Sequence, residues 1–189
     1  MNKITSWFLR AKHWQIFIAF AAVCLISSIV AAGSDLPKVR SLSDVGKADL
    51  LNLGLTMVIM LLLIGWFWSM GLFLNSIVKP QLKLGTKFLG FALIFPAAYV
   101  PVFFAVFFTA NAALLVLILP FHFLAMYCLF YGLYFVSKSL VMAETGKQAT
   151  FYDYAGPFFL IWFFPIGVWF TQPRINRLYA EQTSLQDPG

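Results

Sequence analysis

The sequence predicts an all-α protein, a polytopic transmembrane helical bundle with four spans and a proline-broken segment at its C-terminal end. Three observations support this fold class. Hydrophobic residues make up 61% of the 189-residue chain, and charged residues make up only 11%. The apolar residues gather into long runs, and short loops between these runs carry nearly all the Lys and Arg. A soluble domain of this length has no interior large enough to bury so much apolar surface.

The number of spans follows from the lengths of the apolar runs, because a helix needs about 20 residues to cross a hydrocarbon core about 30 Å thick. The apolar block at 88–136 is too long for one crossing, and we divide it at its polar interruption, 109–111. The chain then forms a single integral membrane domain, 1–189. Four runs are predicted as spans: about 14–32, 50–78, 88–108 and 112–136.

The last apolar run, 155–170, is predicted to re-enter the membrane or to lie in its interface. The run is short, and Pro165 removes a backbone hydrogen bond near its middle. A crossing would also carry Arg174 and Arg177 to the outside, whereas Lys and Arg are enriched in cytoplasmic loops. A fifth span remains the alternative, because the run is strongly apolar.

The distribution of positive charge predicts that both termini lie in the cytoplasm. With four spans, the outer side carries three basic residues, all within the loop at 33–49, and acidic residues balance them. The inner side carries ten: Lys3, Arg10, Lys12, Lys79, Lys83, Lys87, Lys138, Lys147, Arg174 and Arg177. This asymmetry agrees with the excess of Lys and Arg on the cytoplasmic side of membrane proteins.

Several motifs carry a resemblance that covers most of the chain. They are AKHWQIF at 11–17, LPFH at 119–122, FFLIWFFPIGVWF at 158–170 and QPRIN at 172–176. With these motifs the chain resembles a group of small bacterial multi-pass membrane proteins, which implies a place in the bacterial inner membrane. In size and architecture the chain is also similar to the small membrane subunits of antiphage defence systems, such as that of Kiwa, and the likeness extends the expectation to defence.

An intramembrane polar site is predicted around His122, because an ionisable side chain within a span is costly and often functional. Tyr127, Tyr131 and Tyr134 follow at helical spacing, on or near one face of the same helix. The four side chains would line a proton or ligand path. The alternative is helix–helix packing, in which a neutral His122 forms an interhelical hydrogen bond and the tyrosines fill space.

A second candidate is a cytoplasmic interface formed by Lys138, Lys147, Arg174 and Arg177. Basic side chains at this depth attract anionic lipid headgroups and fix the topology. The alternative function of this basic rim is to dock a cytoplasmic protein.

The sequence contains no pattern of a catalytic, cofactor-binding or metal-binding site. It has no paired carboxylates, no nucleophile beside a base, no glycine-rich phosphate loop and no metal-ligand spacing. We therefore expect neither an enzyme nor a cofactor. The net charge of +6 comes from residues at the ends of apolar runs, so we expect the partner of this charge to be anionic lipid and not nucleic acid.

Two functions of different classes remain. The first is a non-enzymatic inner-membrane subunit that forms homo-oligomers and acts as an anchor, sensor or effector for a cytoplasmic protein. The second is a small channel or transporter whose path is lined by His122 and the tyrosines. The two differ in one structural respect, which is whether polar side chains from different spans converge on one cavity.

Overall fold

The computed structural model describes residues 3–32, 46–108 and 112–186, which are almost entirely helical and include no strand. The predicted all-α bundle is thereby confirmed. Its elements are α1 (Lys3–Arg10), α2 (His13–Ala32), α3 (Lys47–Ile77), the 3-10 turn η3 (Pro80–Leu82), α4 (Lys87–Phe108), α5 (Ala112–Thr145), α6 (Phe151–Trp162) and α7 (Phe164–Gln186).

Four of these helices, α2 to α5, are long and apolar enough to cross a membrane, so the chain is a multi-pass membrane protein. Their bounds lie close to the predicted spans, with two differences. Helix α3 begins at Lys47, three residues before the predicted start, and α5 continues nine residues past position 136. The predicted turn at 109–111 lies outside the described residues.

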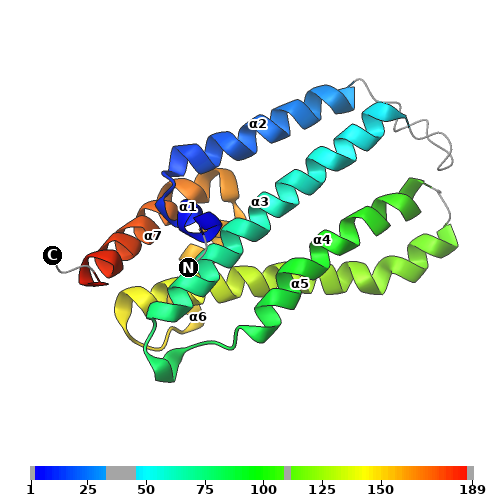
Figure 1. Ribbon diagram of the computed structural model, residues 1–189. Helices are drawn as coiled ribbons and strands as arrows, with labels where there is room; N and C mark the ends of the chain where they lie inside the picture. The colour runs from blue at the N-terminus through cyan, green and yellow to red at the C-terminus, as the bar shows by residue number, and fades with distance from the viewer. Residues whose placement is uncertain (1–2, 33–45, 109–111, 187–189) are drawn as a thin grey trace.

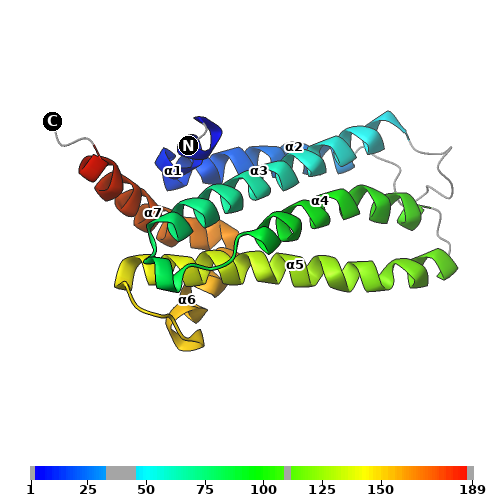
Figure 2. The ribbon, with the colours of Figure 1, turned by 60° about the horizontal axis from the view of Figure 1, so that its bottom comes forward.

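The spans form two antiparallel pairs, α2 beside α3 and α4 beside α5 (Figures 1 and 2). Helices α3 and α5 lie close together where α1, α6 and α7 gather, and they diverge toward the opposite end (Figure 2). We call the end where α1, α6 and α7 gather the core end. After Asp49, the buried residues of α3 all fall within 66–75. The apolar core is therefore concentrated at one end of the bundle.

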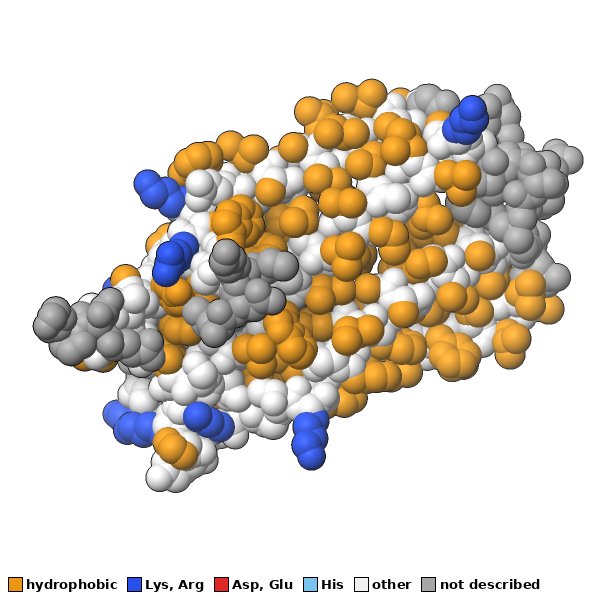
Figure 3. All heavy atoms as spheres, in the orientation of Figure 1, with side chains coloured by type: hydrophobic (Ala, Val, Ile, Leu, Met, Phe, Trp, Pro, Cys, Tyr) orange, Lys and Arg blue, Asp and Glu red, His pale blue; other side chains and the backbone are white. Residues whose placement is uncertain are grey.

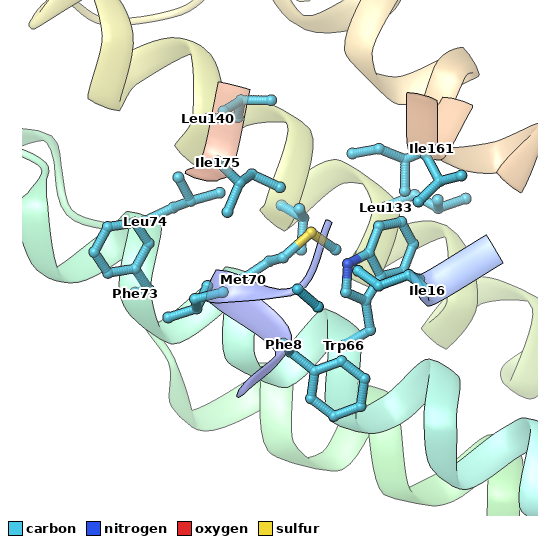
Figure 4. Packing of buried hydrophobic residues seen from close by; sticks show 14 of the residues in the cluster. Phe8, Ile16, Trp66, Met70, Phe73, Leu74, Leu133, Leu140, Ile161 and Ile175 are labelled. Atoms are coloured by element: carbon cyan, nitrogen blue, oxygen red, sulfur yellow. The ribbon is translucent and has the colours of Figure 1, made fainter. Parts of the chain in front are cut away.

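Two glycines allow the close packing at the core end. A side chain at Gly65 would place its Cβ 2.8 Å from the ring of Phe8, so α1 can lie directly against α3. A Cβ at Gly71 would come within 2.9 Å of the Leu89 side chain, where α3 meets α4. Buried residues of α1, α2, α3, α5, α6 and α7 form the main hydrophobic cluster (Figure 4).

The C-terminal segment folds as a helical hairpin and does not form one straight crossing. Helices α6 and α7 meet at Phe163, and the tip of the hairpin points into the bundle (Figures 1 and 2). Pro165 is the second residue of α7, where a helix needs no backbone donor. The break is thus near the predicted place. Pro157 does not break the run, since α6 continues through it.

The surface fits a membrane environment. Apolar side chains cover the middle of the molecule, and the visible Lys and Arg side chains lie toward its ends (Figure 3). Large apolar residues are widely exposed on all four long helices; Ile29, Leu61, Ile94 and Val116 are each more than 60% exposed. Contact of such apolar surfaces with lipid hydrocarbon is favourable, whereas their contact with water is unfavourable.

Candidate functional site

His122 joins α5 to α4. Its side chain is half-buried, and its Nδ1 lies 3.3 Å from the hydroxyl oxygen of Tyr99. The ring also lies 5.7 Å from the ring of Phe103, one turn further along α4. All of these contacts join α5 to α4, which agrees with the alternative in which His122 packs the two helices together.

The three tyrosines of α5 face different neighbours. Tyr127 is 58% exposed and only approaches the ring of Phe88 on α4, at 6.1 Å. Tyr131 packs edge-on against the same ring at 4.6 Å. Tyr134 instead packs against Tyr154 of α6, at 5.5 Å. The three tyrosines therefore connect α5 with α4 on one side and with α6 on the other.

A cavity of about 270 Å³ lies between α3, α4, α5 and the tip of the α6–α7 hairpin. All fourteen residues that line it are apolar, and Phe67, Leu133 and Trp162 are among them. His122 and the three candidate tyrosines do not belong to its lining. The cavity is thus an apolar space, separate from the predicted intramembrane polar site.

A fully buried polar side chain, that of Gln172 of α7, lies at the core end. Its carbonyl oxygen accepts a hydrogen bond of 3.0 Å from the indole Nε1 of Trp66 on α3. Its amide nitrogen donates to the backbone oxygens of Phe8 and Ala11, at 2.8 and 3.1 Å. One side chain therefore satisfies groups from α3, from α1 and from the junction between α1 and α2.

Asn176, one turn after Gln172, strengthens the same junction. Its amide donates to the backbone oxygens of Arg10 and Ala11, each at 3.2 Å. On the α2 side, the ring of His13 lies 4.5 Å from that of Trp169. These contacts explain why the chain bends between α1 and α2, since the carbonyls freed at the bend are bonded to α7.

The predicted basic rim is divided in the structure. Arg174 forms a two-pronged ion pair with Glu144 at the end of α5, with its Nε donating to Oε1 at 2.8 Å and its Nη2 donating to Oε2. Arg177 approaches the same carboxylate at 3.8 Å. Lys138 lies apart and donates to the Tyr134 hydroxyl, and Lys147 is exposed. The two arginines thus link α7 to α5.

Asp153, the third residue of α6, has a carboxylate that is bonded to Thr150, the residue before the helix. The hydroxyl and the backbone N–H of Thr150 both donate to Asp153 Oδ2, at 2.7 Å. The bond from the hydroxyl has the largest effect and the bond from the backbone N–H the next largest, and both hold the pKa of the Asp153 carboxyl below its usual value. The start of the hairpin is therefore fixed where the chain leaves α5.

Sequence reasoning missed the pairing of Gln172 with Trp66 and that of Arg174 with Glu144. The available signal was the motif QPRIN, in which three polar residues follow a long apolar run. Within the described residues, no three His, Cys, Asp or Glu side chains gather as a metal site would require. Family models, curated proteins and solved structures include no match to this chain.

Proposed function

We propose that the protein is a non-enzymatic subunit of the bacterial inner membrane that presents α7 to a cytoplasmic protein. The observation that carries this proposal is the buried network of Gln172. This residue fixes α7 to α3 and α1, and Arg174 fixes it to α5 through Glu144. A helix bonded to three others in this way suits a rigid platform better than a mobile gate.

The end of α7 extends beyond this platform. Tyr179 is the last residue that packs against the main cluster, with its ring 5.3 Å from that of Phe73. After it, α7 continues to Gln186 with mostly exposed side chains, and Leu185 is 75% exposed. In Figures 1 and 2 this end points away from the spans. We propose that it contacts the partner.

The channel alternative has less support. A conducting path needs polar groups or water along its length, but the cavity between the spans has only apolar side chains in its lining. Homo-oligomerisation, anionic lipid as a further partner and a role in antiphage defence remain parts of the proposal that rest on the sequence.

Photo-crosslinking in the native membrane tests the partner. A photoreactive amino acid at Leu185 is expected to give a discrete adduct with a cytoplasmic protein. The same amino acid at Ile29, which is 65% exposed on α2, should label lipid. A chain shortened after Tyr179 should keep its thermal stability and lose the partner, because the removed residues add nothing to the main cluster.

Two results would overturn the proposal. The first is the same set of protein adducts from Leu185 and from Ile29, because such adducts would only report random collision. The second is ion flux in proteoliposomes that contain the purified chain and that depends on His122.

A further inference from the structure

The apolar cavity lies in the half of the bundle nearer the core end. On α4 its lining residues are Leu93, Pro96 and Ala97. They follow Lys87, the first residue of α4, by six to ten positions, or about 9–15 Å along the helix axis. Half of a hydrocarbon core is about 15 Å thick. The cavity therefore lies at the depth of the acyl chains of one leaflet.

Water is a poor occupant of this space. A buried water needs two to four polar partners, and an apolar cavity of about 150 Å³ is known to stay dry and to bind benzene instead. This cavity is larger, at about 270 Å³, and its lining offers only hydrocarbon, aromatic and thioether groups. Leu133 and Ile161, both labelled in Figure 4, form part of that lining. Its natural occupant is a flexible apolar chain.

The contact between α5 and α6 leads from this cavity to a positive charge. Phe130 and Trp162 both line the cavity, and their rings lie 4.8 Å apart. One turn further along α5, Tyr134 meets Tyr154, and the amine of Lys138 lies over both rings, at 5.2 and 6.0 Å. The amine also donates to the Tyr134 hydroxyl at 3.0 Å.

The length of this path fits one lipid chain. Lys138 follows Phe130 by eight positions on α5, and Trp162 follows Tyr154 by eight positions on α6, which corresponds to about 12 Å on each helix. No carboxylate pairs with Lys138 among the described residues. Its charge is therefore available to an anion at headgroup depth, where tyrosine and lysine side chains commonly meet lipid.

We propose that the cavity binds one acyl chain of an anionic phospholipid from the leaflet at the core end, with the headgroup at Lys138. The lipid would fill the space between α3 and the tip of the α6–α7 hairpin. It would thereby connect the hairpin to the spans at the depth of the acyl chains, as Gln172 connects α7 to α3 and α1 at the core end. This site is independent of the partner proposed above.

A photoreactive lipid tests the site in the full-length chain. The chain is reconstituted in vesicles of phosphatidylethanolamine and phosphatidylglycerol that contain a tracer of phosphatidylglycerol with a diazirine in the middle of one acyl chain. After illumination, mass spectrometry locates the labelled residues. We expect label on the buried lining residues Leu93, Leu133 and Ile161 in excess of label on exposed residues at similar depth, such as Ile94.

Two adjacent alanines supply a matched pair of variants. Ala97 lines the cavity, and Ala98 is exposed on the outside of α4. Ala97→Phe should lower the labelling of the lining residues about tenfold, because a filled cavity leaves no room for a chain. Ala98→Phe should leave it unchanged. Lys138→Gln should remove the preference for phosphatidylglycerol over a phosphatidylcholine tracer of the same chain.

Each opposite result overturns a stated part of the proposal. Equal labelling of lining and exposed residues in the unmodified chain shows that no chain is bound in the cavity, whether or not the variants fold. Undiminished labelling in Ala97→Phe has the same meaning. An unchanged lipid preference in Lys138→Gln refutes the headgroup position. Cross-links from an introduced Ala97→Cys to a second copy of the chain would identify a protein occupant.

Discussion

At the scale of single residues, the Gln172 side chain satisfies three polar groups in a place that water does not reach. The Trp66 indole N–H and the two backbone oxygens, of Phe8 and Ala11, would each lose a hydrogen bond without it. A buried polar group without a partner costs more than the net gain of an ordinary hydrogen bond. The position therefore tolerates few substitutions, although it belongs to no catalytic site.

Gln172→Leu tests this dependence, because leucine preserves most of the volume and removes every hydrogen bond. We expect the free energy of unfolding in bicelles to fall by about 2–3 kcal/mol, at about 1 kcal/mol for each bond between helices. Gln81→Leu, in the exposed turn η3, is the control and should change little. A loss below about 0.5 kcal/mol would show that the network contributes little.

His122→Phe tests the packing role of the intramembrane histidine. The distance of 3.3 Å to the Tyr99 hydroxyl and the half-buried position predict a modest loss of stability, about 0.6 kcal/mol. Tyr99→Phe should cost a similar amount, and the double variant should cost no more than either single one. Unchanged stability together with a lost pH-dependent conductance would instead favour the channel.

The sequence could indicate His122 as unusual, since an ionisable residue in a long apolar run stands out by itself. It could not indicate Tyr99 as its partner, because 23 positions separate them and the angle between α4 and α5 decides the contact. The same limit applies to Gln172, whose partners lie more than 100 positions away. Polar residues at helix ends are common, and only the fold determines which of them become buried.

At the scale of elements, the C-terminal hairpin depends on a very close approach of α6 and α7. Gly167 of α7 lies against the Leu160 carbonyl of α6, and a Cβ at Gly167 would overlap that oxygen. The backbone N–H of Gly167 also donates to the Phe163 oxygen at 2.9 Å, within the turn that joins the helices. The tip of the hairpin therefore has room for glycine alone.

Gly167→Ala is expected to open the hairpin. The added methyl group cannot be accommodated by a side-chain rotation, since the atom that it meets belongs to the backbone. We expect a clear fall in the melting temperature in micelles and faster proteolysis near Phe163. Gly156→Ala in α6 is the matched control, because its Cβ would have open space and alanine favours helix. Equal melting temperatures for the two variants would contradict the close approach.

The length and hydropathy of the spans were enough to predict four of the helices, because a bilayer sets both quantities. The short helix α1 was not predicted, since eight residues with a basic side chain at each end also fit the basic stretch that precedes a first span. The hairpin was predicted only as a broken segment. Its turn at Phe163 depends on the packing of Gly167 and on the position of Pro165, and no periodic pattern expresses that geometry.

At the scale of the whole molecule, the bundle is asymmetric along the axis of its spans. Polar bonds and the apolar core both concentrate at the core end, whereas the far halves of the two helix pairs diverge (Figure 2). A side-chain bond from Ser27 to Asn52 joins α2 to α3 in that far half. Helices α2 and α3 are thus bonded to each other at the far end, whereas the two helix pairs are joined to each other mainly at the core end.

This asymmetry gives a topology that cysteine labelling can test. The start of α3 and the end of α7 lie at opposite ends of the bundle (Figure 1), and the excess of Lys and Arg predicts that the core end faces the cytoplasm. The background is a chain with Cys24→Ala and Cys128→Ala. In intact cells, an impermeant maleimide should react with Lys47→Cys and should spare Thr183→Cys until the membrane is permeabilised. Reaction of Thr183→Cys in intact cells would place α7 outside and reverse the orientation on which the proposed cytoplasmic partner depends.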